Sequence, residues 1–568
     1  MVDWKIKSGK ISSQEKMGDY HPIVLELLKN RGISKKGEIK DFFEFNYENL
    51  TDPLNISNME KAVDRIAKAK EKKEKIFIFG DYDADGVTAT ALIFETLENL
   101  GFKNVSVYIP DRQVEGYGIN ETALKHLKKL KTDLIITVDC GISNWKEIKK
   151  ANELGMNVII TDHHSIPEKL PEAFCIINPN LENSGFAAKD LAGVGVAFKL
   201  AQALYKKMDP KNIDWLKWLL DIIGIGTIAD CVPLLFENRI LAKYGLLVLS
   251  KTRRIGLQEM FKVGRIIISE NDMPDVHKVA FQIAPRINAA GRMDHASVSF
   301  NLLLEKNQAK ARNLALEVEG RNQERQKVTA EIYREVQILA QNLFKDKKFI
   351  FAENEHWPVG ILGLVAGKIT EEFKKPSIIL QKQEKEYVGS LRSIPEVNIV
   401  ECLRECSDLT VKFGGHSQAA GVTILHENIG KFYKKLSEIV EKKLKGKEIV
   451  SVLDIDMEIS SEDIDWEFMS ELKKMEPFGQ GNPEPVFLVK NMVIADLRVC
   501  GNGSKHLKLS LKGESGGPKI FDSIGFGFGD RFPNIKKGDK IDIVFNLKED
   551  SWNGSKKIQF NLIDLRII

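Results

Sequence analysis

The stretch IFIFGDYDADGV, residues 76–87, joins four apolar residues to three aspartates that share five positions. The apolar residues predict a buried strand, and Asp81, Asp83 and Asp85 follow its end. Such a turn has a purely structural explanation, with Asp85 as the N-cap of the next helix. Because similar turns recur further along the chain, we favour a functional explanation.

Short apolar runs alternate with helical stretches from about residue 74 to residue 178. This alternation is typical of an α/β domain with a parallel sheet and crossover helices. We therefore expect five strands, at residues 76–79, 105–109, 134–138, 158–161 and 174–177.

Polar side chains follow the predicted strands. Arg112 lies just after the second strand, Asp139 after the third and the sequence DHH, residues 162–164, after the fourth. The carboxyl ends of parallel strands form the edge at which such sheets bind ligands, so we expect a shared site. A further acid, Asp230, lies in the apolar sequence GIGTIADCVPL.

These side chains predict a metal centre. Oxygen-rich sites with a single imidazole suit Mn²⁺ or Mg²⁺, whereas structural zinc sites use thiolates or more histidines. Two ions about 4 Å apart, bridged by Asp139, can activate a water and clamp a phosphoryl group. Taken singly, Asp139 could be a helix N-cap, His163 and His164 a polar turn, and Asp230 the partner of an arginine. As one set, the metal ligands are Asp83, Asp85, Asp139, His163 and Asp230.

The pattern changes twice in the rest of the chain. A proline-free helical stretch from about residue 302 to residue 344, interrupted only by Gly320, suits a connecting helix or a pair of helices between domains. A smaller α/β unit follows, and from about residue 449 apolar and polar residues alternate as in the strands of a small barrel. We expect an N-terminal segment, a first α/β domain, a helical connector, a second α/β domain and a β-barrel at residues 1–50, 51–275, 276–345, 346–446 and 447–568.

The composition is that of an ordinary soluble globular protein, with 43% hydrophobic and 29% charged residues. Because the net charge of +3 is close to neutral, binding of nucleic acid has to be argued from local sites. No segment predicts a signal peptide or a membrane span. The six cysteines form no CxxC pair, which indicates reduced thiols in the cytoplasm without disulfides or a zinc site.

Four motifs, DYDADG, DCG, DHH and GTIADCVPL, resemble in this order the DHH phosphoesterase superfamily. Within it, APRINAAGRMD, EGRNQERQ, GSLRS, FGGHSQAAG and EPFGQGNPEPVF resemble the RecJ family of bacterial exonucleases, from about residue 20 to the C-terminus. The resemblance implies a DHH domain, a DHH-associated domain and a C-terminal OB-fold. It also implies a metal-dependent exonuclease that degrades single-stranded DNA from 5′ to 3′, to 5′-mononucleotides, in DNA repair and recombination.

The resemblance places the metal ligands on the five residues assigned above and gives catalytic roles to Asp139 and His164. His164 would lie beside the scissile phosphate, where it stabilises charge or donates a proton. Many relatives carry a histidine where this chain has Phe79, which cannot coordinate a cation. We therefore expect one metal to be held by fewer protein groups and to exchange more easily. Asp81 receives no firm ligand role.

A second set of residues would contact DNA. Three of them would form a cationic pocket for a terminal phosphate, since arginine suits bidentate phosphate contact. Others would follow the backbone, and aromatic residues of the OB-fold would stack on bases. The arginines could instead lie on a solvated surface or in ion pairs between domains. The assigned residues are Arg112, Ser390 and Arg392 for the pocket, Arg286, Arg292, Gly415 and His416 for the backbone, and Phe478 and Trp552 for stacking.

Two other functions fit parts of the sequence. One is a DHH phosphodiesterase for short oligoribonucleotides or cyclic dinucleotides, but such enzymes typically lack the OB-fold. The other is a non-catalytic, RecJ-like DNA-binding scaffold, which loss of the metal carboxylates would mark. We expect a monomer that binds single-stranded DNA and no membrane, with a helicase and a single-strand-binding protein as further candidate partners.

Overall fold

The computed structural model describes residues 2–9, 20–112, 114–187, 189–269, 273–447, 449, 452–501, 503–513, 519–550 and 556–568. The chain divides into two compact units. The larger comprises residues 50–232 and 241–449, and the smaller comprises residues 1–49, 233–240 and 450–568.

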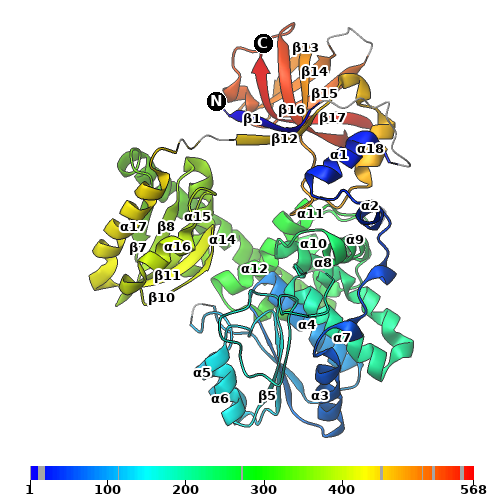
Figure 1. Cartoon of the computed structure of the whole chain (residues 1–568), viewed down its shortest axis with the longest axis vertical. Coiled ribbons are helices and arrows are strands. Elements are labelled where there is room, and N and C mark those ends of the chain that lie inside the picture. Colours follow the sequence, from blue (N-terminus) through cyan, green and yellow to red (C-terminus); the bar gives the residue numbers. More distant parts are fainter. Residues whose placement is uncertain are drawn as a thin grey trace. The chain divides into compact units, whose positions relative to one another are not determined.

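The larger unit contains the predicted parallel sheet, whose strand β5 is labelled in Figure 1. The strand order is β3-β2-β4-β5-β6. All five predicted strands are present and pair in parallel. Their bounds are β2 (Ile76–Gly80), β3 (Val105–Tyr108), β4 (Leu134–Val138), β5 (Asn157–Thr161) and β6 (Cys175–Ile177).

Helices cover both faces of this sheet. On one face, α5 (Glu121–Lys129) and α6 (Trp145–Glu153) bury an apolar core against β2, β4 and β5. On the other lie α3 (Met59–Glu71), α4 (Ala84–Asn99) and α7 (Gly193–Met208). Burial on both faces explains why β2 and β4 are almost entirely apolar, with Thr137 of β4 as the exception.

The helices that follow complete the first domain. Near the sheet lie α8 (Leu220–Ala229), α10 (Ile255–Val263), α12 (Ala284–Met293) and α13 (Ser297–Leu304). Asn288 of α12 accepts a hydrogen bond from the first amide of α4, at 2.8 Å. The acid Asp221 of α8 pairs with Arg254, at 3.1 Å, so the acid–arginine explanation considered for Asp230 applies to Asp221.

The predicted connector is a 36-residue helix, α14 (Gln308–Leu343). Of the two possibilities, one helix or a pair, the structure has one helix, because α14 continues through Gly320. A glycine inside a helix costs only about 1 kcal/mol relative to alanine. The packing of α14 on α10, α12, α13 and α15 (Val359–Phe373) stabilises the helix around it.

The second α/β domain has a mixed sheet of order β10-β11-β9-β8-β7. Of its strands, β7 (Ile350–Asn354) and β8 (Ser377–Lys382) run parallel, whereas β9 (Glu386–Arg392), β10 (Lys412–His416) and β11 (Ala419–Leu425) pair antiparallel. One face packs on α14 and α15, and the other on α16 (Ile399–Glu405) and α17 (Ile429–Leu444).

The smaller unit contains the predicted barrel. Five strands close on themselves in the order β13-β14-β15-β17-β16, through a further pairing of β13 with β16. Their bounds are β13 (Phe487–Cys500), β14 (His506–Lys512), β15 (Ile520–Gly525), β16 (Lys540–Asp550) and β17 (Lys557–Ile567). The C-terminal part of the chain thus supplies every strand of the closed barrel.

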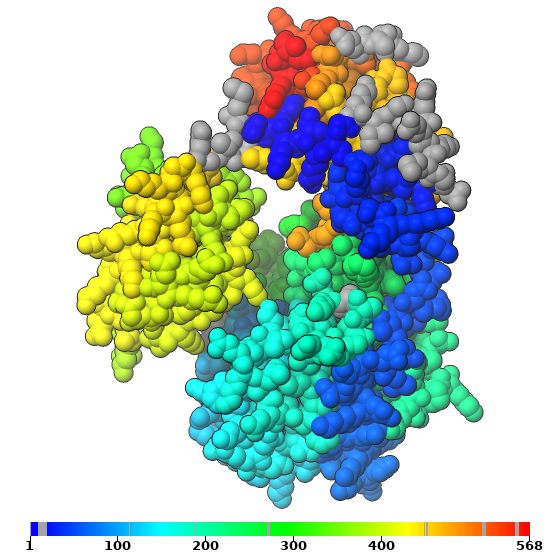
Figure 2. All heavy atoms as spheres, viewed as in Figure 1, coloured from blue at the N-terminus to red at the C-terminus, as the bar shows by residue number. Residues whose placement is uncertain are grey.

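The N-terminal segment belongs to the same unit as the barrel. Its strand β1 (Asp3–Ser8) pairs in parallel with β12 (Val452–Glu458), and α1 (Pro22–Asn30) and α2 (Lys36–Phe43) share the barrel's apolar core. Figure 2 shows this blue segment packed directly on the orange and red strands. The alternation predicted for β12 fails at Asp456, which is buried and accepts hydrogen bonds from Lys7 and the amide of Val486.

Of the two stacking candidates, the structure describes only Phe478. Phe478 is partly buried against the barrel core, and Trp552 lies outside the described residues. Among the helices that the structure describes, none is long and apolar enough to cross a membrane.

Candidate active site

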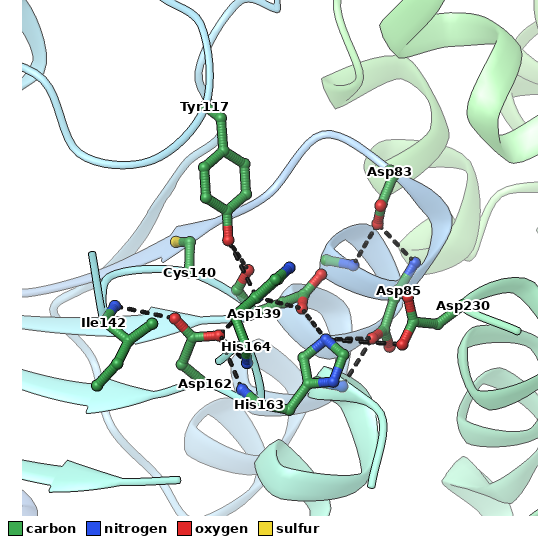
Figure 3. Close-up of polar contacts among 12 residues, drawn as sticks. Asp83, Asp85, Tyr117, Asp139, Cys140, Ile142, Asp162, His163, His164 and Asp230 are labelled. Carbon is green, nitrogen blue, oxygen red and sulfur yellow. Dashed lines mark hydrogen bonds and ion pairs between the residues drawn. The ribbon is translucent and has the colours of Figure 1, made fainter. Parts of the chain in front are cut away.

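The turns after β2, β4 and β5 meet at the carboxyl edge of the parallel sheet, as predicted (Figure 3). His163 lies at their centre: its Nε2 is 3.1 Å from Asp139, 3.6 Å from Asp230 and 4.0 Å from Asp85. The fifth predicted ligand, Asp83, groups with Asp81 and Asp139. The structure therefore brings together all five residues proposed as ligands.

The backbone around the site fixes these carboxylates. Asp83, and not Asp85 as the structural explanation of the turn assumed, is the N-cap of α4, where it accepts from the amides of Asp85 and Gly86, both at 3.0 Å. Asp85 is free of that role because it accepts from the first two amides of α7, at 2.7 and 2.8 Å. Asp139 caps no helix, since the N-cap of α6 is Asn144.

Gly193, the first residue of α7, is needed for this close approach. A Cβ atom there would lie 2.5 Å from Oδ1 of Asp139, which is shorter than any ordinary contact. Only glycine lets the amide end of α7 reach the carboxylates.

Several buried polar atoms at the site lack a hydrogen bond within the described part of the chain. They are Oδ1 of Asp81, Oδ1 of Asp139 and Nε2 of His163. Buried polar groups are normally satisfied, so these atoms indicate a ligand that neutralises them. Two sets of side chains, Asp81 with Asp83 and Asp139, and Asp85 with His163 and Asp230, each have ligand atoms within 4.8 Å of one another. Both sets fit a divalent cation.

Burial and crowding disfavour the charges of this cluster. Burial, together with the other aspartates, raises the pKa of Asp85 to about 7 and that of Asp230 to about 9. The same causes raise the pKa of Asp139 well above its usual range. Burial and the charge of His164 lower the pKa of His163 to about 4, so its ring is neutral, the form in which histidine binds metals.

Comparison with known proteins places the chain in a family. The sequence model of the DHH family, N-terminal domain, matches residues 75–227, the DHHA1 domain residues 346–442 and the RecJ OB domain residues 455–564. The single-stranded-DNA-specific exonuclease RecJ of Bacillus subtilis is 38% identical over 99% of this chain and 71% of its own length. RecJ of Haemophilus influenzae is 33% identical, over 96% of both chains. The chain belongs to the RecJ family.

The structure of RecJ from Thermus thermophilus in complex with Mn²⁺ is also similar. It superposes with a TM-score of 0.82 at 27% identity, and covers all of this chain and 79% of the other. The complex of the same protein with Mg²⁺ gives a TM-score of 0.76. The predicted combination of a DHH domain, a DHH-associated domain and an OB-fold is thus confirmed for this RecJ-family chain.

His164 lies 4.0 Å from the candidate ligand Asp139, but its nearer partners are two groups outside the predicted ligand set. Its Nδ1 lies 2.8 Å from the buried carboxylate of Asp162 and 3.1 Å from the hydroxyl of Tyr117, which also donates to the carbonyl of Asp139. Burial alone would lower the pKa of His164, but the hydrogen bond and charge of Asp162 raise it to about 9. The ring therefore carries a proton on Nδ1 and is fixed in orientation.

Sequence reasoning left Tyr117 and Asp162 without these roles. Asp162 accepts from the amides of Ile142, His163 and His164, so it orders the DHH turn as well as the imidazole. Tyr117 lies in the segment between β3 and α5, and its only sequence signal is that it follows Arg112 after a predicted strand end.

A group of arginines lies beside the carboxylates. The Arg112 guanidinium lies 4.8 Å from the ring centre of Tyr82, in a cation–π contact. Arg112 also contributes to the lowered pKa values of Arg292, which is about 10, and Arg392, although burial is the larger cause for both. Mutual repulsion between these partly buried cations is relieved by a bound anion, so the group suits a phosphate.

Within this group, Arg392 donates from Nη1 to Ser390 Oγ, at 2.8 Å, and Arg292 donates to the carbonyl of Gly360, at 2.9 Å. Arg286 is apart from it: its guanidinium pairs with Glu319 at 2.6 Å. Gly415 and His416 lie in the exposed hairpin of β10 and β11. Their contacts with DNA stay predictions.

Phe79 is fully buried in the core between β2 and α5, where it stacks on Tyr108 with ring centres 5.3 Å apart. It therefore contributes no ligand atom. Asp81 is buried, its Oδ1 has no hydrogen bond within the described residues, and its carboxylate groups with those of Asp83 and Asp139.

Proposed function

We propose that this protein is a metal-dependent exonuclease that degrades single-stranded DNA from the 5′ end to 5′-mononucleotides. One observation carries the proposal: the crowded carboxylates with His163 adjoin a group of partly buried arginines whose charges repel one another. Bound cations would neutralise the carboxylates, and a phosphate would neutralise the arginines. The names of the similar proteins, which are RecJ exonucleases specific for single-stranded DNA, support the same substrate.

Two cations, Mn²⁺ or Mg²⁺, would be held by the two sets of side chains. We assign Asp81, Asp83 and Asp139 to one and Asp85, His163 and Asp230 to the other, with Asp139 close enough to serve both. Bound cations supply a water nucleophile at neutral pH and stabilise the charge of the phosphoryl oxygens. This assignment adds Asp81 to the ligands predicted from the sequence. We propose that Asp81 supplies a ligand atom to the first cation, which Phe79 cannot do.

The protein's own groups orient the substrate and move the proton. With Nδ1 of His164 donating to Asp162, its Nε2 is left to contact the scissile phosphate or protonate the leaving oxygen. Arg112, Ser390 and Arg392 bind the terminal phosphate, and the stacking of Arg112 on Tyr82 holds its guanidinium in place.

The alternatives are less well supported. A phosphodiesterase for short oligoribonucleotides or cyclic dinucleotides does not account for the OB domain at residues 455–564. A non-catalytic scaffold does not account for a cluster in which every candidate ligand is present. We further propose a cytoplasmic monomer with the domain limits expected from the sequence, and a helicase and a single-strand-binding protein as partners.

Digestion of end-labelled oligonucleotides tests the function directly. With Mn²⁺, a 5′-labelled single strand should release labelled mononucleotide at once, whereas a 3′-labelled strand should shorten gradually. RNA of the same sequence and duplex DNA serve as controls. Release of label from the 3′ end first, or faster hydrolysis of short RNA than of DNA, would favour the phosphodiesterase alternative.

A further inference from the structure

A basic pocket lies on the second α/β domain, where α14, α15 and α17 end. It has a volume of about 580 Å³ and no carboxylate among its lining residues in the described part of the chain. Four of the residues that line it are Lys348, Lys374, Lys375 and Lys447.

One of these lysines has a structural role. Lysines near helix C-termini stabilise the last carbonyls, and Nζ of Lys375 donates to the carbonyls of Phe344 and Lys345, at 2.9 and 2.7 Å. Burial and the nearby charge of Lys348 lower the pKa of Lys375. Lys348, Lys374 and Lys447 are exposed, and within the described residues none of them forms an ion pair.

The pocket shares a sheet edge with the proposed phosphate site. Arg392 pairs with Ser377 at the start of β8, and Ser377 pairs with Ile350 at the start of β7. Lys375 and Lys348 each precede one of these strands by two residues.

The distance along this surface suits a nucleic acid strand. The Arg392 guanidinium lies against Gly363 of α15, whereas the pocket lies at Phe373, ten residues further along the helix. At 1.5 Å per residue the separation is about 15 Å. A strand with the 3.4 Å spacing of B-DNA spans this distance in about four nucleotides.

We propose that Lys348, Lys374 and Lys447 bind the phosphodiester backbone of the DNA away from the scissile bond. The inference rests on the proposed function, which supplies the polyanion. Lysine is a point charge that contacts phosphates without reading bases, so the site adds affinity for any sequence. Its contribution grows with substrate length and falls with salt, unlike that of the terminal phosphate pocket.

The test compares short and long substrates in a triple variant, Lys348→Gln, Lys374→Gln and Lys447→Gln, of the full chain. Lys375 is retained because it caps backbone carbonyls. With Mn²⁺ and 5′-phosphorylated oligothymidylates, KM for a 20-mer should rise about tenfold, whereas kcat and KM for a 3-mer should stay within about twofold of wild type. Binding of the 20-mer in EDTA is measured by fluorescence anisotropy at several salt concentrations. The slope of the logarithm of the affinity against the logarithm of the salt concentration should be shallower by about 2 in the variant than in wild type.

A matched control carries the same charge change elsewhere on this domain: Lys385→Gln, Lys431→Gln and Lys434→Gln, all at exposed positions. It should bind the 20-mer like wild type. Equal weakening by both triple variants, or an unchanged slope in the pocket variant, would overturn the site. The proposed DNA site would also be overturned if the pocket variant lost binding to an acidic peptide but bound DNA like wild type. If wild type hydrolyses neither oligonucleotide, the proposed function fails, but the slopes in EDTA still decide the inference.

Discussion

Asp139 belongs to one proposed cation set, lies 3.1 Å from His163 of the other, and is 2% exposed. Asp139→Asn keeps its volume but removes its charge and one strong ligand oxygen. We expect kcat to fall at least about 100-fold at saturating Mn²⁺, with unchanged circular dichroism. Calorimetry should show weaker Mn²⁺ binding. Retention of more than a tenth of wild-type activity would rule out a bridging role.

The two adjacent histidines differ in protonation and in partners: His163 is neutral and lies among the candidate ligands, whereas His164 is protonated and pairs with Asp162. Their variants should therefore fail in different ways. His163→Ala removes a neutral ring that lies 3.1 Å from Asp139, so Mn²⁺ affinity should fall at least tenfold. His164→Ala should lower kcat by about 100-fold, as loss of a general acid does, and leave Mn²⁺ affinity within about twofold. Calorimetric titration of both variants separates these roles. A larger loss of affinity in the His164 variant would mean that the assignments are exchanged.

At the scale of single elements, α1 begins at an unusual cap. Nδ1 of His21 accepts from the amide of Ile23, at 3.3 Å, and burial lowers the pKa of His21 despite nearby acids such as Glu471. The unfolded chain therefore binds a proton at higher pH than the folded one. The cap contributes fully above the unfolded pKa of about 6.5 and is lost as the pH falls below it.

His21→Asn should keep the cap but remove its titration, since asparagine is a good N-cap. We expect the melting temperature of the variant to fall less than that of wild type between pH 7 and pH 5. Calorimetric melts at both pH values measure the difference. Equal pH dependence of the two proteins would show that the His21 cap does not titrate in this range.

Arg239 joins three segments of the smaller unit. Its fully buried guanidinium donates to the carbonyls of Phe42, Lys474, Met475, Glu476 and Pro477, at 2.9 to 3.5 Å. It also lies 3.9 Å from the ring centre of Phe42. The guanidinium thus supplies hydrogen bonds to carbonyls that lie at the end of α2 or outside regular helices and strands.

Arg239→Met removes a donor from all five carbonyls, although those of Met475 and Pro477 keep a hydrogen bond from Nδ2 of Asn482. The free energy of unfolding should fall by about 3 kcal/mol or more. Arg498→Met, at a position whose side chain is 80% exposed, is the control and should change it by less than about 0.5 kcal/mol. Urea denaturation of both variants gives the values. Similar stability of the two would mean that water satisfies the carbonyls.

The sequence predicts elements well where a local pattern reports burial. The parallel strands were found because both faces of β2 and β4 are buried, and the site residues because strand ends gather at one edge. Pairing between segments that are far apart in the chain produces no local hydrophobic pattern, so the sequence did not predict it. The partnership of β1 with β12 joins residues 3–8 to 452–457, and the inward turn of Asp456 depends on Lys7 and Val486, far away in the chain. Asp81 was left unassigned for a similar reason, since its burial beside Asp139 is visible only in three dimensions.

At the scale of the whole molecule, both α/β domains supply the proposed end-binding pocket. Arg112 comes from the edge of the first sheet, and Ser390 and Arg392 come from β9 of the second. The charge of Arg112 acts on Arg392, so the two domains meet at this point of the larger unit. A phosphate bound there fixes how far the strand extends to the carboxylates, and a pocket that ends there excludes a continuing strand.

This arrangement predicts polarity and end dependence. Arg392→Ala removes a charged hydrogen-bond donor worth about 1.5–3 kcal/mol, so KM for 5′-phosphorylated strands should rise about tenfold or more. The preference for a 5′-phosphate over a 5′-hydroxyl should shrink, and kcat should change less than KM because the contact is the same in ground and transition states. Arg404→Ala, an exposed arginine on α16, is the control and should keep the wild-type preference. Undiminished discrimination in the Arg392 variant would place the phosphate pocket elsewhere.

The wild-type protein should not cleave circular single strands. It should also cleave duplex ends poorly, because each base-pair step that has to be unpaired costs about 1.4 kcal/mol. Efficient cleavage of circles would contradict the pocket as the origin of polarity, because a circle has no end for these arginines to hold.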